Sequence, residues 1–275
     1  MTKACPPDPV IDGDTAAALM EPLTELVAQA GAAILAVDRA AMRIEGKADG
    51  SPVTEADLAA DRIIKDGLTR LAPRVPALSE ERAQQAEPFY EGSFFLIDPL
   101  DGTKEFVAGR AEFTVNLALV TNGTPVLGII SAPALGLIWR GLVGRGAERL
   151  AGDGTTRAAP IHTRHLPQAG NPWTVAVSRS HGDARTEAFI ESRPGAIRQV
   201  LGSSVKFCRV AEGAVDIYPR LAPTHEWDIA AGHAIVTAAG GKVTDPQGAE
   251  LRFGKGARDF IVPAFIAWGD PSAAR

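Results

Sequence analysis

Residues 97–106 read Ile-Asp-Pro-Leu-Asp-Gly-Thr-Lys-Glu-Phe, and they follow directly from the apolar run Phe94–Ile97. This order predicts a buried strand that ends at Asp98, then a tight turn and a helix that begins near Thr103. Two carboxylates three positions apart at such a corner can reach one hard cation, while the first backbone N–H groups of the helix favour an anion. The stretch therefore indicates phosphate chemistry beside a metal ion.

Two amphipathic helices are predicted before this corner. Apolar residues recur at three- and four-residue spacing over Ala16–Ala41, and a second helix begins at Thr54 and ends before Pro73. The predicted strands after the corner are Phe113–Val120, Pro125–Ala132 and Gly136–Val143. The run Gly144–Pro160 is rich in Gly, Ala and Thr, so we expect a boundary there between residues 1–155 and 156–275, which are also compatible with one domain.

The second half alternates between strands and helices. The predicted strands are Thr174–Ser178, Ile197–Leu201, Val215–Tyr218 and Lys242–Thr244. The predicted helices are Ala184–Glu191, Val205–Ala214 and Ile229–Ala239. This alternation predicts a layered α/β arrangement.

The composition is that of an ordinary globular protein. Of 275 residues, 45% are hydrophobic and 22% charged, and the formal net charge of −5 argues against a nucleic-acid or anionic-membrane binder. The N-terminus shows no secretory signal, and no stretch approaches the roughly 18 apolar residues of a membrane span. The sequence has two isolated cysteines, Cys5 and Cys208. A disulfide between them is possible, but two isolated cysteines are more typical of a protein in the reducing cytoplasm.

Five acids stand at predicted element boundaries, where rigid backbone positions a side chain: Asp57, Glu80, Asp98, Asp101 and Asp228. Mg²⁺ prefers oxygen ligands, keeps several waters and is often shared between carboxylates and a substrate phosphate. Two such ions can polarise phosphoryl oxygens, activate a water and stabilise the leaving oxygen. The acids therefore form a candidate metal site for phosphate hydrolysis.

Each acid also has a structural interpretation. Thr54-x-x-Asp57 is a capping box, and for Asp57 taken alone this is the stronger interpretation. The adjacent acids Glu80 and Glu81 fit a pair in a solvated loop. Asp101 and Asp228 fit helix starts. Asp98 is the hardest to explain in this way, because an acid that closes an apolar strand is costly unless it is paired or bound to metal.

Other phosphatase chemistries fit poorly. Neither cysteine stands five residues before an arginine, as a cysteine phosphatase requires. Asp12 and Asp14 have the spacing of an aspartyl-phosphate enzyme but follow no convincing strand, so we expect an N-terminal loop there. The sequence contains no HExxH, CxxC pair, GxSxG or Walker motif. His225 and His233 are expected to be structural.

Three motifs together resemble the inositol monophosphatase superfamily of metal-dependent, lithium-sensitive phosphatases. They are Ser79-Glu80-Glu81, Asp98-Pro-Leu-Asp101-Gly-Thr103 and Trp227-Asp228-Ile-Ala-Ala-Gly232. Their order and spacing match over residues 19–266. The resemblance implies an αβαβα sandwich of the inositol monophosphatase and fructose-1,6-bisphosphatase type.

Further details resemble the 3′(2′),5′-bisphosphate nucleotidase branch, of the bacterial sulfate-assimilation type. They are Lys104-Glu105-Phe106, Val177-Ser-Arg-Ser-His181, Gly202-Ser-Ser-Val-Lys206-Phe-Cys208, Ala211-Glu-Gly and Tyr218-Pro-Arg220. The branch implies a Mg²⁺-dependent phosphomonoesterase that removes the 3′-phosphate of adenosine 3′,5′-bisphosphate, with its 5′-phosphosulfate analogue as a further substrate.

The resemblance also implies residue roles. Two or three Mg²⁺ ions would be held by Glu80, Asp98, Asp101, Asp228 and the carbonyl of Leu100. Asp57 and Thr103, supported by Glu80, would orient the attacking water. The substrate would be contacted by ten residues: Glu80, Leu100, Asp101, Gly102, Thr103, His181, Ser203, Lys206, Arg220 and Asp228.

Two alternatives stay open. An inositol- or sugar-phosphate phosphatase has the same fold, and a nucleotide-sensing protein without turnover would keep the pocket. Asp57, Thr103 and Glu80 together speak against the sensor. We expect a small-molecule nucleotide as partner and no nucleic acid. The protein is expected in the cytoplasm as a monomer or homodimer, with peripheral association with the inner membrane left open.

Overall fold

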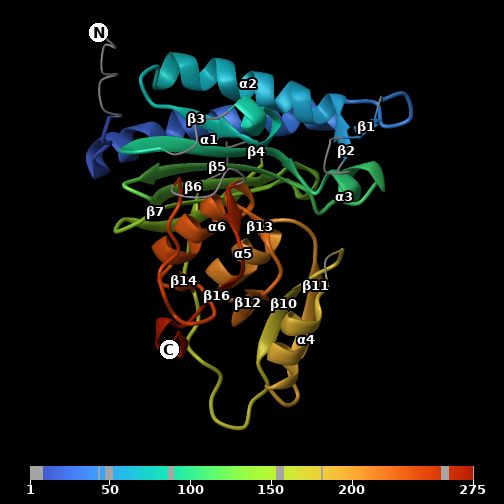
Figure 1. Ribbon diagram of the computed structural model, residues 1–275, viewed down its shortest axis with the longest axis vertical. Coiled ribbons are helices and arrows are strands. Elements are labelled where there is room, and N and C mark those ends of the chain that lie inside the picture. Colours follow the sequence, from blue (N-terminus) through green and yellow to red (C-terminus); the bar gives the residue numbers. More distant parts are fainter. Residues whose placement is uncertain are drawn as a thin grey trace.

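The computed structural model describes residues 9–42, 44–46, 52–85, 90–152, 158–180, 182–254 and 260–274. It has five layers, in which two sheets alternate with three layers of helix (Figure 1). This arrangement confirms the αβαβα sandwich. The division into two domains stays a prediction.

The first two layers are a helix pair and a large sheet. Helices α1 (Gly13–Ala36) and α2 (Glu55–Leu71) cover one face of the seven-stranded sheet, at the top of Figure 1. The strand order is β3-β4-β5-β6-β7-β8-β9. The strands are β3 (Ala77–Ser79), β4 (Ser93–Asp101), β5 (Thr114–Thr121), β6 (Thr124–Ala132), β7 (Leu137–Leu142), β8 (Gly146–Ala151) and β9 (Ala159–Ile161).

Strand β5 shows why this sheet is buried on both faces. Leu117 and Leu119 pack into the cluster formed with α1 and α2, whereas Ala118 and Val120 pack into the cluster formed with the helices on the opposite face. Successive side chains of a strand point to opposite faces, so a continuous apolar run fills two cores. The sheet therefore stands between helices on both sides.

The remaining layers come from the second half of the chain. Helices α5 (Val205–Ala211) and α6 (Glu226–Ala238) lie between the two sheets (Figure 1). The second sheet has the order β11-β10-β12-β16-β14 and carries α4 (Ala184–Glu191) outside. Its strands are β10 (Thr174–Ser178), β11 (Ile197–Leu201), β12 (Ile217–Arg220), β14 (Lys242–Thr244) and β16 (Phe265–Trp268).

Short elements complete the described chain. They are β1 (Ile44–Gly46), β2 (Pro52–Thr54), η1 (Glu80–Gln85), α3 (Thr103–Val107), η2 (Pro133–Leu135), β13 (Thr224–His225), β15 (Ile261–Val262) and η3 (Pro271–Ala273). Most predicted elements are confirmed, four of them with the predicted bounds: β10, α4, β11 and β14.

The run Gly144–Pro160, where a boundary is predicted, contains all of β8 and the start of β9. Both strands pair antiparallel at the edge of the first sheet. The small residues of this run obscured the alternation of apolar and polar positions by which a strand is predicted. The two sheets divide the chain between Ile161 and Thr174 instead.

The N-terminal loop around Asp12 is also corrected. Asp12 is the N-cap of α1, and its carboxylate accepts the Thr15 backbone N–H at 2.7 Å. Gly13 and Asp14 therefore lie in the first helical turn, where an acid is favourable. At its other end α1 stops at Ala36, five residues before the predicted end.

Helix α1 meets, by length and composition alone, the criterion for crossing a membrane, and among the described helices it is the one that does. The core helix of a folded domain passes the same test, so the expectation of no membrane span stays a prediction. The helix packs Leu23, Val27 and Ile34 into the core, each without exposed surface.

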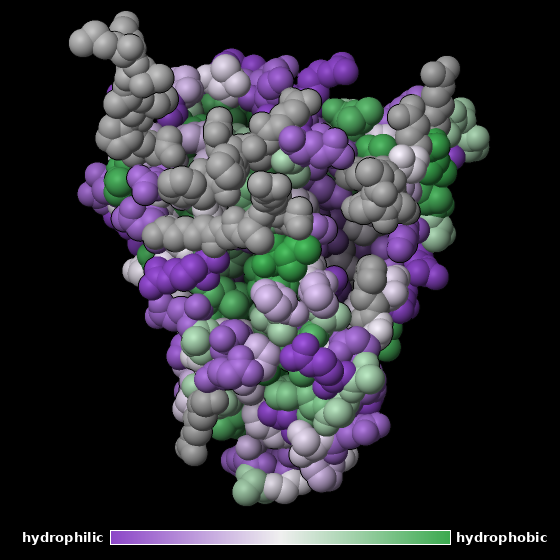
Figure 2. All heavy atoms as spheres, in the orientation of Figure 1, coloured by the Kyte–Doolittle hydropathy of each residue, from purple (hydrophilic) through white to green (hydrophobic). Residues whose placement is uncertain are grey.

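On the face seen in Figure 2, hydrophilic residues are widespread and hydrophobic ones form small groups.

Candidate active site

A cavity of about 420 Å³ lies between the two sheets and gathers most of the predicted site. Residues from both halves of the chain line it. The predicted ones are Glu80, Asp98, Leu100, Asp101, Gly102, Thr103, Ser203, Lys206, Arg220 and Asp228. Asp57 lies behind Thr103, to which it is hydrogen-bonded. His181 lies outside the described residues.

The corner after the apolar run differs from the prediction. Strand β4 does not end at Asp98: a bulge follows that residue, and pairing resumes where Asp101 faces Thr114. The bulge adds one residue to the strand and re-aims its side chains. Gly102 then adopts φ +90°, which glycine tolerates, and α3 begins at Thr103 as predicted.

Asp57 serves two purposes with its two oxygens. Its Oδ2 accepts the backbone N–H of Thr54 at 2.8 Å and the Thr54 hydroxyl at 2.6 Å, which confirms the capping box of α2. Its Oδ1 accepts the Thr103 hydroxyl at 3.1 Å. The structural and the functional interpretations of Asp57 are therefore compatible.

The loop that carries Glu80 is fastened to α2 on both sides of that residue. Asp61, one turn after Asp57, accepts the hydroxyl of Ser79 at 2.6 Å and the Nε of Arg82 at 3.1 Å. Asp61 is only 8% exposed. Asp61 is not among the predicted site residues, although an acid on the apolar side of an amphipathic helix is a signal for such a role.

A second buried network holds Asp101. The Ser204 hydroxyl lies 2.9 Å from Asp101 Oδ2 and 3.1 Å from the Asp228 carbonyl, and it accepts the side-chain N–H of Asn116 at 2.9 Å. Asp228 itself accepts the Thr224 hydroxyl and the His225 backbone N–H. Asn116 was also missed, although an amide within the apolar run of β5 is costly to bury without such a role.

The electrostatics of the acids fit a cation. Burial raises the pKa of Asp101 to about 6, and the negative charge of Asp228 adds to the effect, against the charge of Lys206. A cation between the two carboxylates would reverse this repulsion. Within the described ranges no three Asp, Glu, His or Cys side chains are grouped so that together they could hold one metal ion. This donor set of a few carboxylates fits Mg²⁺, which takes its other ligands from water and substrate phosphate.

The same cavity also carries positive charge over an aromatic ring. Lys206 is 3% exposed, donates to the Ser203 carbonyl, and lies 5.2 Å from the ring centroid of Tyr218. Burial lowers its pKa to about 8, although Asp101 acts in the opposite direction. Arg220 lies beside this group at the end of β12. A buried cation in this cavity suits a second anionic group of a ligand.

The two histidines near Asp228 differ. His233 is buried on α6, and burial lowers its pKa to about 4, which agrees with the expected structural role. His225 lines the cavity, and its ring stacks on Trp227 at a centroid distance of 4.5 Å.

Comparison with known proteins places these features in a family. A model of the inositol monophosphatase family matches residues 16–270. The chain is 39% identical over 250 residues to the 3′(2′),5′-bisphosphate nucleotidase CysQ of Escherichia coli K12, covering 90% of this chain and 98% of that protein. It is 32% identical to the CysQ of Haemophilus influenzae, covering 84% and 85% of the two chains.

Solved structures agree with this relation. The crystal structure of CysQ from Bacteroides thetaiotaomicron aligns with a TM-score of 0.71 and 32% identity, covering 90% of this chain and 97% of that one. The IMPase of Thermotoga maritima aligns with a TM-score of 0.71 and 28% identity, covering 93% and 94%.

Proposed function

The chain belongs to the inositol monophosphatase family, and from this premise we propose that it is a 3′(2′),5′-bisphosphate nucleotidase. It hydrolyses the 3′-phosphate of adenosine 3′,5′-bisphosphate to give AMP and phosphate, with the 5′-phosphosulfate analogue as a further substrate. The observation that carries the proposal is a single cavity lined both by acids suited to a metal and by the buried cation of Lys206.

Two or three Mg²⁺ ions would be held by Glu80, Asp98, Asp101, Asp228 and the carbonyl of Leu100. When bound, Mg²⁺ neutralises charge on the phosphoryl oxygens and makes water a stronger nucleophile. The proposal is supported by the concentration of oxygen donors that line one cavity.

The protein's own groups then act on water and phosphate. The Thr103 hydroxyl donates a hydrogen bond to Asp57. The lone pairs of the Thr103 oxygen are thereby oriented to accept a proton from the attacking water. The backbone N–H groups of Gly102 and Thr103 receive the phosphate oxygens. Water adds to phosphorus as the bond to the 3′ oxygen breaks. One proton of the water stays on the phosphate, the other passes by way of Thr103 and Asp57 to solvent, and the 3′ oxygen takes up a proton from solvent. Ser203, Lys206 and Arg220 hold the remote phosphate.

The test is a phosphate-release assay with Mg²⁺ on three substrates, repeated with Li⁺. We expect kcat/KM for adenosine 3′,5′-bisphosphate to exceed that for inositol 1-phosphate and fructose 1,6-bisphosphate by at least tenfold, with inhibition by Li⁺. Preference for either of the latter two would establish the sugar-phosphate alternative. Tight nucleotide binding without phosphate release would establish the sensor.

Asp61→Ala is expected to weaken Mg²⁺ binding by about tenfold, because Asp61 fastens the residues on both sides of Glu80. Removing a group that orients a metal ligand typically costs 10- to 100-fold in affinity. Calorimetric Mg²⁺ titration measures this effect independently of turnover. Asp66→Ala is the matched control, because Asp66 is exposed on the same helix. Equal Mg²⁺ affinity in both variants would contradict the role of Asp61.

A further inference from the structure

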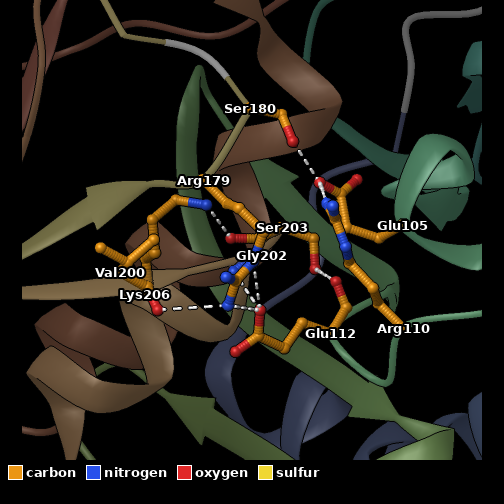
Figure 3. Close-up of polar contacts among 9 residues, drawn as sticks. All are labelled: Glu105, Arg110, Glu112, Arg179, Ser180, Val200, Gly202, Ser203 and Lys206. Atoms are coloured by element: carbon orange, nitrogen blue, oxygen red, sulfur yellow. Dashed lines mark hydrogen bonds and ion pairs between the residues drawn. The ribbon is translucent and has the colours of Figure 1, made fainter. Parts of the chain in front are cut away.

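Glu112, between α3 and β5, reaches to residues of the second half of the chain (Figure 3). Its Oε2 accepts two N–H groups of Arg179, from Nη2 at 2.6 Å and Nε at 3.1 Å, and the backbone N–H of Gly202 at 3.0 Å. Its own carbonyl accepts the Ser203 hydroxyl at 3.3 Å. One residue therefore binds both the end of β10 and the turn before α5.

The contact is close enough to require glycine at position 202. A Cβ there would lie 2.6 Å from the Glu112 carbonyl oxygen and 2.8 Å from the Glu112 Cβ. Gly102 approaches the same place, since a Cβ on it would lie 3.4 Å from that oxygen and 3.3 Å from the Ser203 Cβ. The turn expected to hold the reacting phosphate and the turn that leads to Lys206 thus meet at Glu112.

The turn held in this way has an unfavourable backbone conformation. Ser203 has φ +36°, a left-handed value that is unfavourable for a residue with a side chain. Its carbonyl accepts the ammonium group of Lys206. Strained conformations persist only where neighbours impose them, and the bonds from Glu112, together with the Thr114 hydroxyl that donates to the Ser203 hydroxyl, hold this turn.

We propose that Glu112 is a positioning residue that sets the distance between the phosphate turn at 102–103 and the substrate contacts Ser203 and Lys206. The inference rests on the proposed function and adds a residue to it. Glu112 touches no reacting atom in this scheme. It acts on the part of the nucleotide remote from the scissile bond, so it contributes to nucleotide affinity and leaves the chemical step unchanged.

Two contacts of unequal importance make up this link. The Arg179 side chain is 35% exposed, so solvent screens its ion pair with Glu112. The bond to the Gly202 N–H acts on the turn directly and is made by a charged acceptor, which strengthens it. Loss of the carboxylate should therefore matter more than loss of the guanidinium.

A neighbouring contact keeps the two halves joined without Glu112. Glu105, which is 5% exposed on α3, accepts the hydroxyl of Ser180, and its carboxylate lies 3.9 Å from Arg110 (Figure 3). A Glu112 variant therefore keeps a second link between α3 and the end of β10. We expect such a variant to fold.

The test is steady-state kinetics on Glu112→Ala with adenosine 3′,5′-bisphosphate. KM is expected to rise about tenfold while kcat stays within threefold. The inhibition constant of inorganic phosphate, which reports on the turn at 102–103, should stay within twofold. Glu187→Ala is the matched control. It also removes an ion pair, with Arg198 in the second half of the chain, but Glu187 does not bond to the turn at Gly202 and Ser203. Its KM should be unchanged.

Conservative variants complete the experiment. Glu112→Gln, which keeps the side-chain volume and an acceptor, should raise KM about threefold, and Arg179→Ala should have a smaller effect than Glu112→Ala. A wild type without phosphate release would refute the proposed function. With an active wild type, an unchanged KM in Glu112→Ala would overturn the positioning role, as would an equal loss of phosphate affinity. If the alanine variant does not fold, an unchanged KM in Glu112→Gln would overturn it.

Discussion

Asp98→Asn is expected to lower kcat at least a thousandfold at saturating Mg²⁺. Asp98 is 1% exposed, and its Oδ1 accepts the Leu100 N–H at 3.0 Å, so asparagine can keep the shape and this hydrogen bond. What it loses is the negative charge. Metal ions contribute several kcal/mol of transition-state stabilisation, and each ~1.4 kcal/mol is a factor of ten in rate.

Phosphate release from adenosine 3′,5′-bisphosphate over a Mg²⁺ titration measures this effect, with thermal unfolding to confirm the fold. Asp66→Asn, at an exposed position of α2, is the matched control and should keep full activity. A kcat for Asp98→Asn within tenfold of wild type would show that Asp98 is not a ligand of a catalytic metal.

Gly128→Ala is expected to destabilise the protein by about 3 kcal/mol. Gly128 lies in β6, where α6 crosses the sheet, and a Cβ there would lie 2.2 Å from the Ala231 carbonyl oxygen and 2.9 Å from its carbon. Both are backbone atoms, so no side-chain rotation relieves the clash. The helix itself must move, and Asp228 in its first turn moves with it.

Urea unfolding measures this change in free energy. Gly13→Ala is the matched control, because a Cβ at the start of α1 meets nothing within 4 Å, and it should stay within about 0.5 kcal/mol of wild type. A loss of less than 1 kcal/mol in Gly128→Ala would show that α6 adapts to the added methyl group.

Sequence patterns predicted the fold best where local signals agree with packing. The capping box placed the start of α2, and the bounds of β10, α4, β11 and β14 were predicted correctly because each has a clear apolar period between turn residues. The predicted end of a strand at Tyr218 was wrong, since β12 continues through Pro219 to Arg220. Its pairing with β10 is confined to Ile217, so the missing N–H of Pro219 interrupts no bond on that side.

For the site, sequence and resemblance predicted the lining residues but not what holds them. Order along the chain suggested that Glu80, Asp101 and Asp228 meet, and all three line the cavity. The supports could not be predicted, because they join positions far apart in sequence. Ser204 binds Asp101, and Glu112 binds Gly202, only once the second sheet docks through α5 and α6.

The two oxygens of Asp57 bear on how related sequences should be interpreted. A homologue that had lost all turnover would still need Oδ2 to begin α2, so selection for folding alone would retain this acid. Its presence therefore distinguishes poorly between an enzyme and a sensor. Thr103 is the better marker, because its hydroxyl bonds to Asp57 and Leu100 across the corner and caps no helix. Homologues that have lost turnover should thus be recognised by the loss of the residue equivalent to Thr103, and not by the loss of the residue equivalent to Asp57.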